Sequence, residues 1–155
     1  MNLRAAFLVP TLVVAGMFSV SGAFSRPTQA SRTPYNALGK AAALPFSDGI
    51  LAGNTFYLSG RIGLDPKTGK PPEQAEVEIK LMLDSLKGTL AQAGMTMDDL
   101  VYVQIACTDL SLFEKFNGIY KSYFTTRDLP AREFIGAAAL LRGGHFELQA
   151  IAVRR

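Results

Sequence analysis

The chain has 155 residues, with 16 Lys and Arg against 13 Asp and Glu, so its formal net charge is +3. Arg4 and Arg26 are the only charged side chains in residues 1–30, and the remaining chain carries +1, a balance that argues against a nucleic-acid-binding protein. With one cysteine and one histidine, the sequence excludes an internal disulfide, a typical structural zinc site and a Cys/His nucleophilic pair.

Residues 1–30 have the layout of a secretory signal peptide. A short basic start precedes an apolar run over residues 5–20, and small residues follow before Ala23 and again before Ala30. We expect cleavage after Ala23 or after Ala30. The pattern therefore predicts an exported, periplasmic protein without a membrane attachment once the signal is removed.

Two other interpretations of the same segment are an uncleaved membrane anchor and an organellar transit peptide. The apolar run is short for a bilayer span, and Pro10 and Gly16 interrupt it. A transit peptide would be amphipathic, whereas this run is continuously apolar. Export is the interpretation that the pattern favours.

The chain after the signal predicts a tether over residues 31–43, which are rich in proline and alanine, followed by one domain over residues 44–155. The tight-turn dipeptide Gly53-Asn54 lies between two apolar runs, residues 46–52 and 55–59. This arrangement predicts a β-hairpin.

The segment from Glu73 to Ala93 predicts an amphipathic helix, because its apolar residues recur at steps of three and four and Gly94 follows as a stop signal. Residues 100–108 predict a buried strand. The pattern Ser111-Leu-Phe-Glu114 is typical of a capping box at the start of a second helix.

Two further strands are expected at residues 132–141 and 145–153, on either side of Gly143-Gly144. The predicted order is ββαβαββ, an α+β domain with helices on one face of a mixed sheet. His145, at the start of the last strand, is interpreted as a surface or hairpin histidine. Cys107 is interpreted as a small core residue.

Arg132 and Glu147 are ionised side chains placed in apolar runs that look like paired strands. Such side chains are rarely found there without a partner. They predict either a structural ion pair between neighbouring strands or a site that holds a small anionic substrate and a water molecule. The sequence leaves both interpretations open.

A series of short segments occurs in an order that resembles the Rid (reactive intermediate deaminase) family, also called YjgF. The resemblance covers nearly all of residues 45–155. It rests on Tyr57-Leu-Ser59-Gly60-Arg-Ile62, Asp65-Pro66-Lys-Thr-Gly69, Ala91-Gln-Ala93-Gly94, Phe116-Asn117 with Tyr120 and Phe124, Pro130-Ala131-Arg132 and Glu147-Leu-Gln-Ala-Ile-Ala152.

The resemblance implies a chorismate-mutase-like fold that assembles as a homotrimer, with sites in the clefts between subunits. Family members with this arginine hydrolyse imines and enamines derived from amino acids to 2-keto acids and ammonia, without a metal or organic cofactor. By position, Arg132 resembles the arginine that binds the substrate carboxylate, and Glu147 resembles the acid that positions water. Ser59, with Gly60 beside it, and Asn117 match positions that line the cleft.

The chain departs from the family pattern at three positions. Phe46 occupies the place of a frequent tyrosine, Phe134 that of a frequent cysteine, and Gln149 that of a second acid. The two phenylalanines are expected to contact substrate, and together the changes affect the substrate range. From the residues alone, Ser59 fits a hydrogen-bonded turn position equally well, and Asn117 fits a structural hydrogen bond.

The alternative function is a non-catalytic module that binds or senses a small carboxylate in the same cleft. A weaker alternative is ribonuclease-type activity, which some relatives imply. The small charge after signal removal and the lack of a run of basic and aromatic residues argue against that alternative.

Overall fold

The computed structural model describes residues 31–36 and 44–155. The predicted signal peptide, both candidate cleavage sites and residues 37–43 of the predicted tether lie outside the described residues. Within the described part of the chain, no helix combines the length and the apolar character that a membrane crossing requires.

The described residues contain six strands, which form one mixed sheet in the order β1-β2-β3-β6-β4-β5, and among them only the β4–β5 pair is parallel. The strands are β1 (Arg32–Tyr35), β2 (Gly49–Ala52), β3 (Thr55–Ile62), β4 (Leu100–Cys107), β5 (Ala131–Gly136) and β6 (Phe146–Val153).

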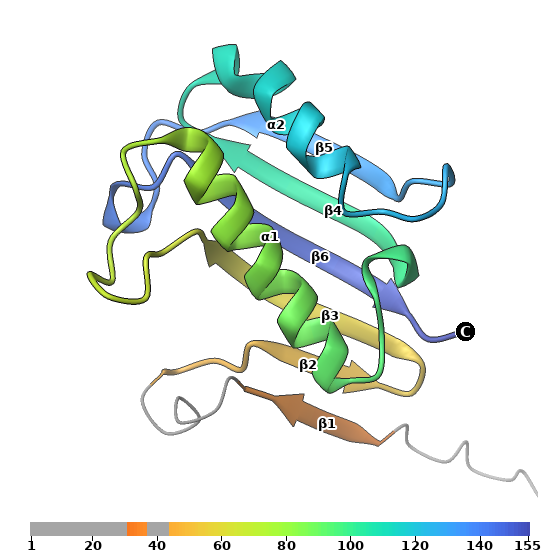
Figure 1. Ribbon diagram of the computed structural model, residues 1–155. Helices are drawn as coiled ribbons and strands as arrows, with labels where there is room; N and C mark the ends of the chain where they lie inside the picture. The colour runs from red at the N-terminus through yellow and green to blue at the C-terminus, as the bar shows by residue number, and fades with distance from the viewer. Residues whose placement is uncertain (1–30, 37–43) are drawn as a thin grey trace, which may run out of the picture.

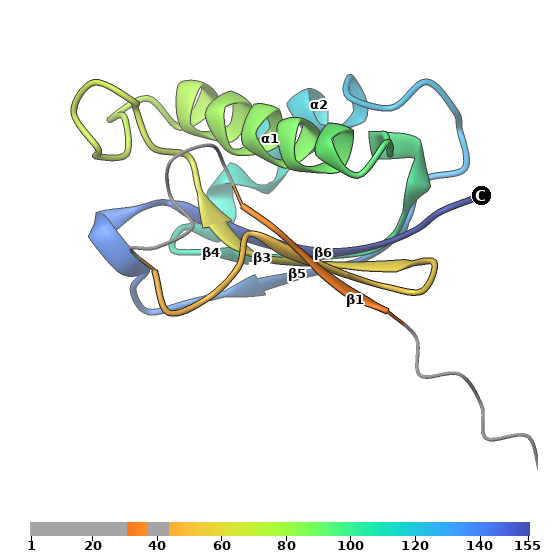
Figure 2. The same ribbon diagram turned by 90° about the horizontal axis from the view of Figure 1, so that it is seen from below.

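Two helices, α1 (Ala75–Gln92) and α2 (Phe113–Lys121), lie on the same face of this sheet (Figures 1 and 2). The opposite face carries no helix from the described residues (Figure 2). The predicted α+β class, with helices on one face of a mixed sheet, is confirmed.

Strand β1 is an addition to the predicted ββαβαββ order. It pairs antiparallel with β2, so that Arg32 lies opposite Ala52 and Tyr35 opposite Gly49. The Tyr35 ring packs edge-on against Phe56, at 5.2 Å between centroids. The predicted tether is therefore wrong for these four residues, because backbone pairing to β2 outweighs their loop-like composition.

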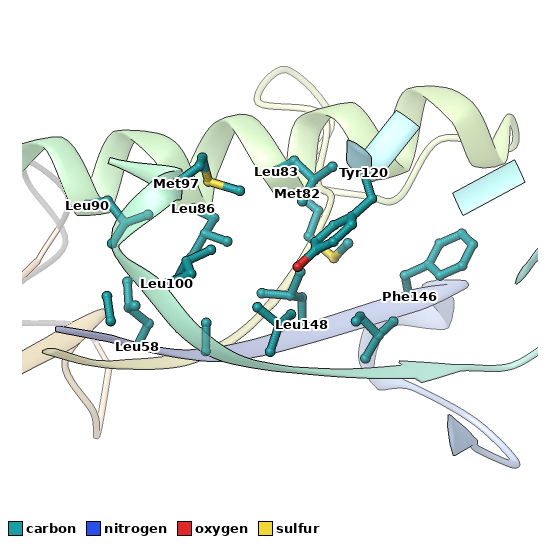
Figure 3. Packing of buried hydrophobic residues seen from close by; sticks show 14 of the residues in the cluster. Leu58, Met82, Leu83, Leu86, Leu90, Met97, Leu100, Tyr120, Phe146 and Leu148 are labelled. Carbon is teal, nitrogen blue, oxygen red and sulfur yellow. The ribbon is translucent and has the colours of Figure 1, made fainter. Parts of the chain in front are cut away.

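Helix α1 covers the core on the helix face of the sheet. Its apolar residues recur at steps of three and four, as the sequence predicted, so they all lie on one side of the helix. Their side chains point at the sheet, where they meet apolar residues of β3, β4 and β6 (Figure 3). The fully buried apolar residues of the helix are Ile79, Met82, Leu83, Leu86 and Leu90. Gly94 follows with φ +69°, a conformation that glycine adopts without strain, so the helix ends there.

The start of α2 differs from the predicted capping box. A 3₁₀ turn, Leu110–Leu112, precedes the helix, and the carboxylate of Asp109 accepts the Ser111 N–H at 2.9 Å. Residue Leu112, at the α2 N-cap position, supplies no side-chain hydrogen bond. The predicted Ser111–Glu114 box is therefore wrong, because Asp109 already caps the turn before the helix.

The last two strands were expected to pair with each other, and in the structure they do not. Strand β6 pairs with β3 on one edge and β4 on the other, while β5 pairs only with β4 (Figure 1). The turn before β6 contains two residues with left-handed backbone, Arg142 (φ +59°) and Gly143 (φ +74°). It carries the chain past β4, so β5 and β6 are not neighbours.

The C-terminal residues support the far end of α1. Arg154 donates from Nη2 to the Ala93 carbonyl at 2.6 Å, and Arg155 donates from Nη2 to the Asp98 carbonyl at 2.6 Å. The last turn of α1 has no basic residue of its own. Since the C-terminal end of a helix dipole favours positive charge, Arg154 provides the charge that the last turn of α1 lacks.

Gly63 should be intolerant of a side chain, because a Cβ there would lie 2.9 Å from Glu78 Cγ and closer still to the Glu78 carbonyl. We expect Gly63→Ala to lower the free energy of unfolding by about 1–3 kcal/mol, measured by urea titration. Gly88→Ala is the matched control, since position 88 faces open space in α1 and alanine should stabilise it by about 0.5–1 kcal/mol. Equal stability of the two variants would contradict the close contact.

Candidate functional site

All of the predicted site residues except Phe134 line one of two pockets of the single chain. One, here called the Arg132 pocket, has a volume of about 270 Å³ and is lined by Asn117 and Arg132 together with Tyr120, Lys121, Leu129 and Pro130. The other, called the Glu147 pocket, has a volume of about 870 Å³. Its lining includes Phe46, Ser59, Gly60 and Glu147.

The guanidinium of Arg132 lies among three aromatic rings. Its Cζ is 5.2 Å from the ring centroid of Tyr120, 5.5 Å from that of Phe113 and 5.8 Å from that of Phe134. Rings at these distances attract a cation through their quadrupoles and limit its movement. The ring of Phe134 also packs edge-on against Phe113 at 5.0 Å, so this residue belongs to the wall that holds Arg132.

Arg132 lacks a counter-ion within the described chain. No carboxylate of the described residues lies within ion-pair distance, and its guanidinium makes no hydrogen bond there. Burial raises the pKa of Tyr120 to about 12, and the charge of Arg132 opposes that rise. An arginine held by rings and left without an anion is a site where an anionic ligand would be bound favourably.

Asn117 adds a second incomplete group to the Arg132 pocket. Its Oδ1 atom is buried and accepts no hydrogen bond from the described residues. A buried acceptor without a donor costs free energy. The structural hydrogen bond that the sequence left open for this oxygen is absent from the described chain, so the atom is available to a ligand or to another subunit.

Glu147 is placed by the alternation of β6. Phe146 and Leu148 on either side of it are fully buried beneath the helices, so Glu147 faces the other side of the sheet. A Cβ at position 60 would collide with Glu147 Oε1. Glycine at this position therefore leaves the space that the carboxylate occupies.

The segment that carries Phe46 is tied down by Ser59. The Ser59 hydroxyl donates to the Ser47 carbonyl at 2.5 Å, and the Ser59 N–H donates to the Asp48 carbonyl at 3.0 Å. Phe46 is 53% exposed at the rim of the Glu147 pocket. Ser59 is thus a hydrogen-bonded turn residue that also lines the pocket, so the two interpretations of this residue are compatible.

Arg61, which was not among the predicted site residues, also holds the segment that carries Phe46 and Asp48. It donates to Thr89 Oγ1 on α1 at 2.9 Å and to the Asp48 carbonyl at 3.3 Å. Burial lowers the pKa of Arg61 to about 10, and the charge of Asp48 partly offsets this effect. The side chain thereby joins α1 to the wall of the Glu147 pocket.

Arg132 and Glu147 do not meet within one chain. Arg132 lies opposite Val103 and Glu147 opposite Ala106, on the two edges of β4. Arg132 contacts α2 rings on the helix face, whereas Glu147 faces the other side. The interpretation as an ion pair between neighbouring strands is therefore wrong for a single subunit.

His145 and Glu78 form a contact that sequence reasoning missed. His145 was interpreted as a surface or hairpin histidine, but its Nδ1 lies 2.6 Å from Oε2 of Glu78, a fully buried carboxylate. The available signal was the position of Glu78 between Ala75 and Met82, on the apolar stripe of α1. An acid on such a stripe indicates a specific partner in the core.

Among the described residues, no group of three or more His, Cys, Asp or Glu side chains is arranged to hold a metal ion. Cys107 is buried, and burial raises the pKa of its thiol. This environment disfavours the reactive thiolate.

Comparison with known proteins places these features among relatives of named activity. The family described as Endoribonuclease L-PSP matches residues 36–154. The chain is 34% identical over 117 residues to the 2-iminobutanoate/2-iminopropanoate deaminase of Escherichia coli K12, covering 74% of this chain and 91% of that protein. It is 38% identical over 115 residues to the mouse protein of the same name, covering 74% and 84%.

A solved structure has the same arrangement of elements. The Yersinia pestis protein YyfA, described as a protein of unknown function of the conserved Rid family, superposes with a TM-score of 0.73 at 30% identity. The match covers 79% of this chain and 99% of that chain.

Asn117→Leu tests whether the Asn117 amide supports the fold. Since its Oδ1 has no donor in the described chain, we expect the free energy of unfolding to stay within about 1 kcal/mol of the parent or to rise. Urea unfolding monitored by circular dichroism measures this. A loss of about 2 kcal/mol or more would mean that the amide makes a structural hydrogen bond after all.

Proposed function

Because this chain belongs to the Endoribonuclease L-PSP family, which is also called YjgF and includes the Rid deaminases, we propose that it hydrolyses 2-imino acids and their enamines to 2-keto acids and ammonia. The family resemblance inferred from the sequence is confirmed. The relatives named above are 2-iminobutanoate/2-iminopropanoate deaminases, which supports a small imino acid as the substrate class.

The observation that carries the proposal is the unpaired guanidinium of Arg132. A carboxylate can accept two parallel hydrogen bonds from a guanidinium, a geometry that a lysine ammonium cannot provide. The aromatic rings around Arg132 fix the direction of the guanidinium. A bound carboxylate would therefore hold the neighbouring C=N carbon in one position.

Hydrolysis then requires a water molecule at that carbon. In the proposed mechanism Glu147 accepts a hydrogen bond from the water and orients it as its oxygen attacks the imine carbon. The C–O bond forms while the C=N π electrons pass to nitrogen, which takes up a proton from the water, and a carbinolamine results. The carbinolamine hydroxyl then loses its proton to the nitrogen, its oxygen forms the C=O bond of the keto acid, and the C–N bond breaks to release ammonia. Imines hydrolyse without a catalyst, so orientation and modest acid-base assistance suffice.

The two halves of this site require a second copy of the chain. Arg132 and Glu147 face opposite sides of one sheet, so we propose that Arg132 of one subunit is completed by Glu147 of its neighbour in a homotrimer. The sheet face without helices supports such packing, because it leaves large apolar side chains exposed: Tyr57 is 51% exposed, Val101 46% and Ile135 38%.

The two phenylalanines that replace residues frequent in the family, Phe46 and Phe134, are also part of the proposal. Phe46 offers a ring without a hydroxyl at the rim of the Glu147 pocket, and Phe134 narrows the space beside Arg132. Both changes favour apolar contact with the substrate side chain over hydrogen bonding. Export remains part of the proposal, and it would bring the enzyme to imines outside the cytoplasm.

Replacing Arg132 should remove turnover without unfolding the protein. For Arg132→Ala we expect kcat/KM to fall about 100-fold or more, since losing a charge-assisted pair costs roughly 3 kcal/mol. Keto-acid and ammonia release from freshly generated 2-aminoacrylate measures this, against the spontaneous rate. Arg132→Lys is the matched control, which keeps the charge but loses the bidentate geometry and should retain only partial activity.

Two outcomes would redirect the proposal. Full turnover by Arg132→Ala would contradict the role of the arginine. If the parent protein does not exceed the spontaneous rate but binds 2-keto acids in calorimetry, the chain is the non-catalytic binding module. Single-stranded RNA incubated under the same conditions is expected to remain intact, and cleavage would support the ribonuclease alternative.

Mixing two inactive variants tests the site between subunits. Arg132→Ala and Glu147→Gln should each lack activity alone, whereas trimers reassembled from equal amounts should regain activity at about a quarter of the sites. The measurement is keto-acid release before and after denaturation and joint refolding. If jointly refolded trimers stay inactive, the two residues do not combine across an interface.

A further inference from the structure

Glu78 is a carboxylate enclosed completely by the protein. It lies in the first turn of α1, and none of its surface is exposed. A charge in such a place is retained only when hydrogen-bond donors replace the water that it has lost. The residues that supply these donors are therefore the ones that Glu78 holds in position.

Within the described chain, the hydrogen-bond partners of the Glu78 carboxylate are His145 and Phe146, at the start of β6. Oε1 accepts the backbone N–H of His145 at 2.8 Å and that of Phe146 at 3.0 Å. Oε2 faces Nδ1 of His145 at 2.6 Å. When the Glu78 carboxylate is ionised it only accepts hydrogen bonds, so Nδ1 is then the donor in this contact.

Glycines allow the backbone to come this close. A Cβ at Gly144 would lie 3.2 Å from Glu78 Oε1 and 2.7 Å from Ile62 Cγ2. A Cβ at Gly63 would collide with the Glu78 backbone carbonyl. The turn before β6 and the end of β3 are therefore both fitted tightly around Glu78.

Glu147 is the next residue after the two backbone donors. It lies opposite Ile62 of β3, while the His145 carbonyl accepts the Thr108 N–H at 3.0 Å on the side of β4. The direction in which Glu147 leaves the sheet therefore depends on how Phe146 is held. We propose that Glu78 is a positioning residue, which fixes the start of β6 and thereby the place of the Glu147 carboxylate.

This inference rests on the proposed function, and it predicts a specific kinetic pattern. Arg132 lies on β5, which pairs only with the far edge of β4, and it has no contact with Glu78. Loss of Glu78 should therefore misplace the water-orienting group while the carboxylate-binding group stays in place. We expect kcat to fall while KM stays nearly constant.

The test compares Glu78→Ala, Glu78→Gln and Leu86→Ala. Glu78→Ala removes both acceptors, and kcat should fall at least about tenfold, as expected when a reacting group is displaced by a fraction of an ångström to an ångström. Glu78→Gln keeps a carbonyl oxygen for the two backbone N–H groups and should stay within about threefold of the parent. Leu86→Ala is the control for general destabilisation, since Leu86 is buried on the same helix about two turns beyond Glu78, away from the start of β6 (Figure 3).

Amide hydrogen exchange of residues 145–147 provides a readout that does not depend on activity. We expect faster exchange in Glu78→Ala but not in Leu86→Ala, at a temperature where both are folded. If the exchange of residues 145–147 is unchanged in Glu78→Ala, or if kcat in Glu78→Ala and Leu86→Ala falls alike, the inference is wrong. If the parent protein itself lacks imine hydrolysis, the proposed function fails, and exchange alone decides whether Glu78 holds β6.

Discussion

Strand β6 is the constraint on which the rest of the molecule depends, because it pairs along both edges and its side chains serve both faces of the sheet. Phe146, Leu148, Ala150 and Ala152 fill the core beneath the helices. Glu147 and Gln149 face the other way, into the Glu147 pocket. A shift of β6 by one residue would exchange the two sets, placing a carboxylate in the core and a phenylalanine in the pocket. The core thus enforces the register that the site requires.

The placement of both helices on one face of the sheet connects the fold to the proposed chemistry. Both helices lie on one face, where α2 supplies the rings and the amide around Arg132 (Figure 2). The other face has only strands beneath the exposed Tyr57, Val101 and Ile135. In the proposed mechanism, a single subunit therefore has the carboxylate-binding arginine without the water-positioning glutamate beside it. Under that proposal, catalysis depends on the assembly of subunits.

Local patterns predicted much of the fold. The steps of three and four in α1 and the Gly53-Asn54 turn indicate structures that short stretches of chain determine, and both were confirmed. The position of β6 between β3 and β4 was not predictable in the same way, because Gly143-Gly144 is compatible with a hairpin to β5. Strand β1 was missed for a similar reason, since its pairing with β2 depends on residues more than a dozen positions away.

In the candidate site, too, local patterns were predictable from the sequence, whereas contacts between distant residues were not. Arg132 and Glu147 were recognisable as charges in apolar strands, but their faces depend on the sheet order. Glu78 lies within a pattern that correctly predicts a helix, and only the structure shows that its partners are His145 and the backbone N–H of Phe146. Residue type and spacing indicate which groups are unusual, whereas distant contacts decide what each group can do.

The central place of β6 has a consequence for aggregation. Within the described residues, β6 is the strand that joins β1, β2 and β3 to β4 and β5. If β6 detached, the edges of β3 and β4 would both expose unpaired backbone groups, which pair readily with strands of other chains. The pairing of β6 with both neighbours therefore protects the protein from edge-to-edge aggregation.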